Sequence, residues 1–192
     1  MTTTLTIPTR DGEVVGTLYS AKSDNPLVIL CHGLGSSASL LSNYGVDLSN
    51  NNYNVFTFDF IGGSYFSLSG GSMKGMTVKT EIAELNDVID HFYSKKPKQK
   101  IIIGGESQGG YVAAMVSAQR NDIAGLVLLY PAFLIQDSAK ELLKQYGSAL
   151  TFQLMGMTLG HQYLTDAASI DPFQEIKSSL ANPWFIRPNC SD

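Results

Sequence analysis

Short segments that are almost wholly apolar alternate along the chain with longer amphipathic ones. Four of the apolar segments are interpreted as strands: Leu27 to Cys31, Val55 to Phe58, Ile101 to Ile103, and Leu126 to Tyr130. A strand that is apolar on both faces is typical of a parallel sheet covered by helices on both sides. The pattern therefore predicts a buried, mostly parallel sheet.

The segments between these strands have helical periodicity. One has an apolar face at three- and four-residue spacing, formed by Ile82, Leu85, Ile89 and Phe92. Another face of the same segment carries polar residues: Glu84, Asp87 and His91. A weaker helix around residues 40–48 has Ser36 or Ser37 as its expected cap, and a third covers Val112 to Arg120. Strands and helices in this order predict a three-layer α/β fold with right-handed crossovers.

Two segments depart from this alternation. Near the start, two apolar runs flank Arg10-Asp11-Gly12, which predicts a hairpin with an Asp-Gly turn. Residues 133–170 form a long apolar insert after a strand, which is interpreted either as a lid over the open end of the sheet or as a helix covering it. The length of 192 residues suits one domain, 1–192.

Composition narrows the class of protein. The chain is 44% apolar with a net charge of −4, which argues against nucleic acid as a partner, because such proteins need a basic footprint. The one basic run, residues 95–100, is expected to be a solvated loop. Cys31 and Cys190 have no zinc-ligand spacing and predict no disulfide scaffold. With no visible signal peptide and no apolar run of membrane-spanning length, the expectation is a soluble cytoplasmic protein without a membrane partner.

A glycine-rich turn, Gly104-Gly105-Glu106-Ser107-Gln108-Gly109-Gly110, joins an apolar strand to a helix rich in small residues. Its glycine spacing matches neither the dinucleotide fingerprint nor the P-loop. It does match G-x-S-x-G, the nucleophile elbow, in which a strained backbone makes the serine hydroxyl project from the turn. The alternative is a capping serine in an ordinary turn. Ser107 is therefore the candidate nucleophile.

A second candidate element is Cys31-His32-Gly33-Leu34-Gly35, at the end of an earlier strand. Acyl transfer builds negative charge on the carbonyl oxygen, and backbone N–H groups stabilise it. In elbow enzymes one donor follows the nucleophile and the other lies in a loop after an earlier strand, which here predicts Gln108 and Leu34. His32 precedes the serine and ends a strand, so it is interpreted as a residue that shapes the loop.

These motifs resemble the α/β-hydrolase superfamily, and within it the small bacterial feruloyl/cinnamoyl-esterase-like and serine-aminopeptidase-like hydrolases. The resemblance covers the chain to about Pro183 and rests on residues 32–35, 58–64, 76–81, 105–110, 130–132 and 163–167. It implies hydrolysis of a small-molecule ester or other acyl compound, with no metal or organic cofactor. It further implies a small lid, with Asp137 and Tyr163 as substrate-facing residues.

The general base is the missing part of this machinery. In this fold the order along the chain is serine, acid, histidine, and of the three histidines only His161 follows Ser107. Residues 182–186 resemble the start of the next family strand, and an ungapped count places Asp192 at the position of the catalytic acid. No residue remains after it for the base, so the chain looks C-terminally shortened.

Three interpretations follow. The chain is a shortened esterase relative with impaired activity, or His161 and Asp137 form a replacement pair, or the protein is a non-catalytic relative that binds acyl compounds or another protein. A peptidase-like amide hydrolase is a further alternative to an esterase. A sheet that ends near Ile186 would leave an apolar flank exposed, which predicts self-association.

Overall fold

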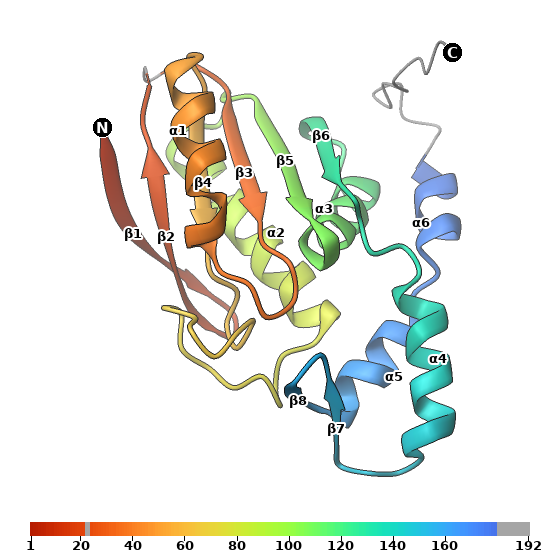
Figure 1. The fold of residues 1–192 in the computed structure, drawn as a ribbon. Coiled ribbons are helices and arrows are strands. Elements are labelled where there is room, and N and C mark those ends of the chain that lie inside the picture. The colour runs from red at the N-terminus through yellow and green to blue at the C-terminus, as the bar shows by residue number, and fades with distance from the viewer. Residues whose placement is uncertain (22–23, 180–192) are drawn as a thin grey trace, which may run out of the picture.

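The computed structural model describes residues 1–21 and 24–179. Its main sheet has six strands in the order β1-β2-β4-β3-β5-β6 (Figure 1). Their bounds are β1 Thr2–Thr9, β2 Gly12–Tyr19, β3 Leu27–Cys31, β4 Asn54–Phe58, β5 Ile101–Glu106 and β6 Ile123–Leu129. The pairs β3–β4, β3–β5 and β5–β6 are parallel, while β1–β2 and β2–β4 are antiparallel. The predicted mostly parallel sheet with an N-terminal hairpin is confirmed.

Helices cover the sheet on both faces. One face is covered by α1 (Ser42–Asn50), which follows the short helix η1 (Ala38–Leu41). The other face is covered by α2 (Val78–Lys95) and α3 (Ser107–Gln119), as Figure 1 shows. This is the three-layer arrangement that the alternating pattern predicts.

Strand β3 shows why the sequence folds in this way, because all five of its residues are buried. Leu27, Ile29 and Cys31 pack into the large core beneath α2 and α3. Val28 and Leu30 pack into a smaller core on the face of α1. A strand with apolar side chains on both faces is stable only where helices remove both faces from water.

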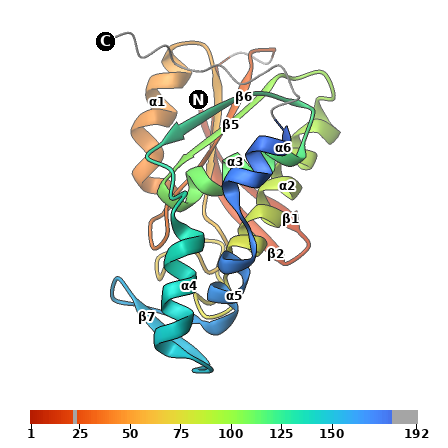
Figure 2. The same cartoon turned by 90° about the vertical axis from the view of Figure 1, so that its right-hand side faces the viewer.

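The insert lies beyond the ends of the parallel strands. It contains α4 (Ile135–Tyr146), the hairpin of β7 (Thr151–Leu154) and β8 (Met157–Gly160), and α5 (His161–Ser169). In Figure 2 these elements lie below the sheet, whereas α6 (Pro172–Ser179) lies beside α3. These elements do not lie on a face of the sheet, and the interpretation of residues 133–170 as a lid stays a prediction.

Some local predictions are corrected. Ser37 is the N-cap residue of η1, as predicted, but its hydroxyl makes no capping hydrogen bond and bonds to Ser39 Oγ at 2.7 Å. The Ser36 hydroxyl is buried without a partner among the described residues. The hairpin turn consists of Arg10 and Asp11, because Gly12 already pairs with Thr9.

Glu84 is a further correction, since the sequence places it on a polar face and the structure buries it to 1% exposure. The segment after β4 covers this part of α2, and the N–H of Ile61 donates to Glu84 Oε2 at 2.9 Å. A polar stripe at helical spacing therefore includes one side chain that the connecting segment shields from water.

The far edge of the described sheet is β6, which pairs only with β5 there. Val127 on this strand is 46% exposed. Residues 182–186, Cys190 and Asp192 lie outside the described residues, so the expected self-association through this flank stays a prediction. None of the described helices combines the length and the apolar character needed to cross a membrane.

Candidate active site

The turn from β5 into α3 carries an exposed serine in strained geometry. Ser107 has φ +51°, in the left-handed region that non-glycine residues rarely occupy. Its side of the turn is open to solvent, whereas the next two residues, Gln108 and Gly109, are buried. Such strain persists only where the surroundings impose it, and it is characteristic of functional sites.

The glycines of this turn are required by close backbone contacts. A Cβ atom on Gly105 would lie 2.6 Å from the carbonyl oxygen of Cys31. A Cβ atom on Gly109 would lie 2.4 Å from the carbonyl oxygens of both Cys31 and His32. Both distances are far inside van der Waals contact, so only glycine permits α3 to approach the end of β3.

The loop after β3 lies directly beside Ser107. A Cβ atom on Gly33 would be 3.2 Å from Ser107 Cβ and 3.7 Å from its Oγ. Gly35 has φ +71° and donates its N–H to the carbonyl of Gly63 at 2.9 Å, which fixes the loop on the segment after β4. None of the described residues accepts a hydrogen bond from the N–H of Leu34. The N–H of Leu34, on the loop whose Gly33 adjoins Ser107, is thus not engaged within the described part of the chain.

Gln108, the other expected donor, carries an N–H group directly after Ser107. It is the second residue of α3, and the first N–H groups of a helix have no partner within the helix. The helix dipole adds partial positive charge at the same end. The N–H groups of Leu34 and Gln108 therefore lie on the two segments that flank Ser107.

Both ring nitrogens of His32 are used in holding the loop. Nε2 accepts from the N–H of Phe60 at 3.1 Å, so Nδ1 carries the proton and donates to the carbonyl oxygen of Gly33 at 2.8 Å. Burial lowers the pKa of His32 below its ordinary value. A neutral ring with both nitrogens engaged links the ends of β3 and β4 and has no free atom to accept a proton from Ser107.

The side chain of Gln108 is buried and bonded on both sides. Its Nε2 donates to Glu81 Oε2 on α2 at 2.8 Å. Its Oε1 accepts from the hydroxyl of Tyr163 on α5 at 2.5 Å. The residue that follows the serine is thus joined to one core helix and to the insert.

Two carboxyl groups are buried beneath this site. Glu81 and Glu84 on α2 are each 1% exposed. Burial raises the pKa of Glu81 to about 8, against the opposing effect of the Gln108 hydrogen bond. Burial likewise raises the pKa of Glu84 to about 9, with the hydrogen bond from Ile61 opposing it. Both groups hold a proton at neutral pH, because a buried charge would lose its hydration.

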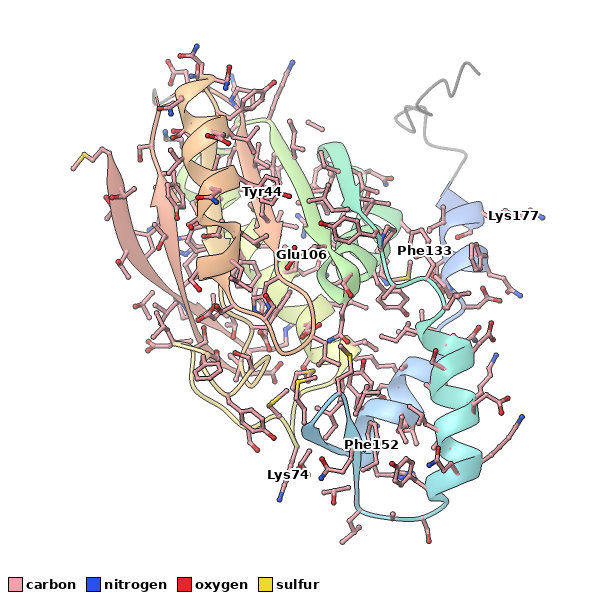
Figure 3. The ribbon with its side chains drawn as sticks, in the orientation of Figure 1. Tyr44, Lys74, Glu106, Phe133, Phe152 and Lys177 are labelled. Atoms are coloured by element: carbon pink, nitrogen blue, oxygen red, sulfur yellow. The ribbon has the colours of Figure 1, made fainter. Side chains whose placement is uncertain are left out.

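Tyr163 differs from the expectation of a substrate-facing residue. It is only 3% exposed, its hydroxyl is bonded to Gln108, and its ring packs 6.0 Å from that of Phe152. Phe152 lies on the hairpin of the insert, beside α5, as Figure 3 shows. Burial strongly raises the pKa of the Tyr163 hydroxyl, which remains a donor. The Tyr163 hydroxyl therefore faces the Gln108 amide and not the solvent.

The structure does not join the predicted replacement base to its acid. Asp137 lies in the first turn of α4 with a 74% exposed side chain, and its neighbouring cation is Lys140 at 3.9 Å. His161 begins α5, and its buried Nδ1 has no hydrogen-bond partner among the described residues. The proposed acid Asp192 is outside the described part of the chain. Nor do the described residues contain a cluster of three or more metal-ligating side chains.

The sequence drew attention to the backbone of Gln108 but missed the role of its side chain. In the sequence, Glu81 is marked only by the family resemblance, as the last residue of the matching segment 76–81. The sequence did contain an indication that Glu81 is buried. Glu81 precedes Glu84 by three residues and Leu85 by four, so all three lie on one side of α2, the helix that packs beneath the serine. An acidic residue next to a buried helical stripe indicates a carboxyl group with an internal partner.

A parallel sheet crossed by helices on both faces, with a strained serine between strand and helix, defines the α/β-hydrolase superfamily. A family model described as serine aminopeptidase, S33, matches residues 22–191, and the chain belongs to that family. No curated protein matches the sequence.

Solved structures show the same fold at low sequence identity. Est1E from Butyrivibrio proteoclasticus with bound ferulic acid has a TM-score of 0.76 and 21% identity, over 89% of this chain and 73% of that one. The Pyrococcus furiosus esterase Pf2001 has a TM-score of 0.67 and 23% identity, over 93% and 67%. A carboxyl esterase from Bacillus coagulans with glycerol has a TM-score of 0.61 and 17% identity, over 75% and 49%.

Proposed function

We propose that this protein is a serine hydrolase that cleaves carboxylic esters through an acyl-Ser107 intermediate. The observation that supports the proposal best is the strained, exposed Ser107 placed beside the Gly33-Leu34 loop. A serine used only as a helix cap needs neither a positive φ nor a second segment packed against it. Esterases among the structural relatives support the same choice of chemistry.

In the proposed reaction the Ser107 oxygen attacks the carbonyl carbon of the ester. The carbonyl oxygen becomes an anion, and the N–H groups of Leu34 and Gln108 stabilise it. Collapse of this intermediate breaks the bond to the alcohol, which leaves with the proton that Ser107 gave up. Water then attacks the acyl-serine and breaks its bond to the Ser107 oxygen; the hydroxyl of the water completes the carboxylic acid, and its other proton goes to Ser107.

The proton acceptor is the weak part of the machinery. Among the described residues His161 is the one histidine after Ser107, and it has no acid hydrogen-bonded to Nδ1. Loss of a triad member costs about 10⁴ to 10⁶ in turnover, while oxyanion stabilisation and binding keep a residual rate. We therefore expect slow turnover that nevertheless depends on Ser107.

The acyl group is proposed to be aliphatic or aromatic. The insert places apolar elements beyond the ends of the strands, where Ser107 lies, and Est1E holds ferulic acid in its solved complex. An ester is favoured over an amide because its alcohol leaves more readily when no strong acid is positioned to protonate it.

A second candidate function is acyl binding without turnover, which the unpaired His161 Nδ1 favours. Hydrolysis of short p-nitrophenyl esters by the intact chain, compared with Ser107→Ala, separates the two. The proposal predicts a slow release of p-nitrophenol that Ser107→Ala abolishes. Equal rates for both proteins would refute an acyl-Ser107 pathway, and retained ligand affinity in the inactive variant would then support the binding function.

A further inference from the structure

The backbone N–H and the side-chain amide of Gln108 are positioned together, because both belong to one residue at the start of α3. The backbone N–H belongs to the turn that follows Ser107, and the whole residue is only 2% exposed. A buried amide must satisfy both its N–H₂ group and its oxygen, because an unpaired buried polar atom costs about 1–3 kcal/mol. The groups that satisfy this amide therefore also determine where residue 108 sits.

The two partners fix the orientation of the amide. The Oε1 atom can only accept, so the hydroxyl of Tyr163 must donate to it. The Nε2 group can only donate, so it faces Glu81 Oε2, with the sulfur of Met76 also 3.8 Å away. A flipped amide would place donor against donor on the Tyr163 side unless the hydroxyl rotated away. In the observed orientation both ends of the amide are satisfied, because Nε2 donates to the Glu81 oxygen and Oε1 accepts from the Tyr163 hydroxyl.

These partners come from different parts of the molecule. Glu81 lies in the first turn of α2, whose N-cap residue Thr77 forms a capping box with Thr80. Tyr163 lies on α5, within the insert, and packs against Phe152 of the β7–β8 hairpin. The same hairpin contacts the loop beside Ser107, since a Cβ atom on Gly35 would lie 2.4 Å from Met157 Sδ. The insert thus touches both segments that carry the N–H donors.

We propose that Tyr163 and Glu81 are positioning residues for the N–H of Gln108, and that Tyr163 makes this donor dependent on how the insert is docked. The proposal rests on the proposed function. Neither side chain touches the reacting atoms. Each acts by holding the amide of Gln108, which in turn holds the first turn of α3 at the serine.

The expected effect follows from what such a donor contributes. Removing one oxyanion donor lowers kcat by about 10²- to 10³-fold. A donor that is displaced but still present keeps part of its stabilisation of the transition state. We therefore expect about a tenfold decrease in kcat for Tyr163→Phe. KM is expected to change little, because the anion exists only in the transition state.

The variants have matched controls in the same chain. Tyr163→Phe is compared with Tyr146→Phe, whose hydroxyl reaches only the exposed carbonyl of Gln153 at 3.4 Å. Glu81→Leu removes the acceptor, and Glu81→Gln restores one. Glu84→Gln is the control on the same helix, since Glu84 is equally buried but bonds to Ile61 and not to Gln108.

Two measurements on the 192-residue chain test this proposal separately from the proposed function. The first is the backbone amide resonance of Gln108 in ¹⁵N-labelled protein, with its hydrogen-exchange rate, which needs no activity. The second is kcat and KM for a p-nitrophenyl ester, with Ser107→Ala as blank. Tyr163→Phe and Glu81→Leu should shift the Gln108 resonance and speed its exchange, while Tyr146→Phe, Glu84→Gln and Glu81→Gln leave it near the wild-type position.

The outcomes are separable. If the Ser107→Ala blank matches the wild type, the proposed hydrolysis fails while the amide resonance still tests the positioning. If the Gln108 resonance and exchange are unchanged in both Tyr163→Phe and Glu81→Leu, the positioning proposal is overturned whatever the activity. The same holds if the two controls move the resonance as far as the test variants, since the effect would then be general loosening.

Discussion

Replacing Glu81 by glutamine should change how the stability of the protein depends on pH. Glu81 is buried with its pKa raised to about 8, whereas an unfolded glutamate has a pKa of about 4.3. Between these values the native state holds a proton that the unfolded state has lost. The contribution of Glu81 to the free energy of unfolding is therefore fully present below the pKa of the unfolded state, and it declines as pH rises toward the pKa of the folded state.

The magnitude follows from proton linkage. One such group lowers the free energy of unfolding by about 1.4 kcal/mol for each pH unit within the window. From about pH 5 to about pH 8 Glu81 alone removes about 4 kcal/mol, a large part of the roughly 5–15 kcal/mol that stabilises a typical domain. Glu84, with its pKa near 9, adds a second contribution of the same sign.

Glutamine mimics the protonated acid, retains an acceptor for Gln108 and does not titrate. Urea unfolding of wild type and Glu81→Gln, measured at intervals from about pH 5 to about pH 8, should give similar stabilities at the acid end. At the alkaline end the variant should be more stable by a few kcal/mol. Glu84→Gln should remove the other part of the slope. Parallel curves for wild type and both variants would refute the assignment of these groups as buried neutral acids.

Other substitutions test the turn itself. Gly109→Ala should abolish stable folding or lower stability by about 3 kcal/mol or more, because its Cβ would meet two carbonyl oxygens, whereas Gly75→Ala should cost no more than about 1 kcal/mol by thermal unfolding. Ser107→Gly should be more stable than Ser107→Ala by about 1 kcal/mol, since glycine relieves the positive φ; equal melting temperatures would argue against strain. His32→Ala should cost about 2–3 kcal/mol by leaving the N–H of Phe60 unpaired, and a stable variant with altered esterase pH profile would instead indicate a proton-transfer role.

The periodicity of apolar residues was sufficient to predict the architecture, because the burial of a strand or helix face determines which neighbouring positions are apolar. In β3 alternate side chains enter two different cores, so an unbroken apolar run is the only pattern that satisfies both faces. The glycine spacing around Ser107 was equally informative, since sterics within a few residues decide where a Cβ atom can fit.

Contacts made across long sequence separations were not predictable in this way. The burial of Glu84 depends on the segment after β4, and the partner of Gln108 on α5 is more than fifty residues away. Nothing local to Tyr163 distinguishes a hydroxyl that faces a substrate from one that faces a buried amide. His161 and Asp137 likewise share an insert, and only its folded geometry shows that they are not paired.

The most direct test of Ser107 as the nucleophile is the intact mass of the protein after prolonged incubation with an activated ester. An activated ester has a good leaving group that needs no protonation, so a weak general base slows acylation of Ser107 less than it slows the attack of water on the acyl-serine, and the adduct should accumulate. We predict a mass increase of one acyl group, mapped by peptide sequencing to Ser107 and missing from Ser107→Ala. Acylation at another residue with Ser107 unmodified, while ester is being hydrolysed, would contradict the account.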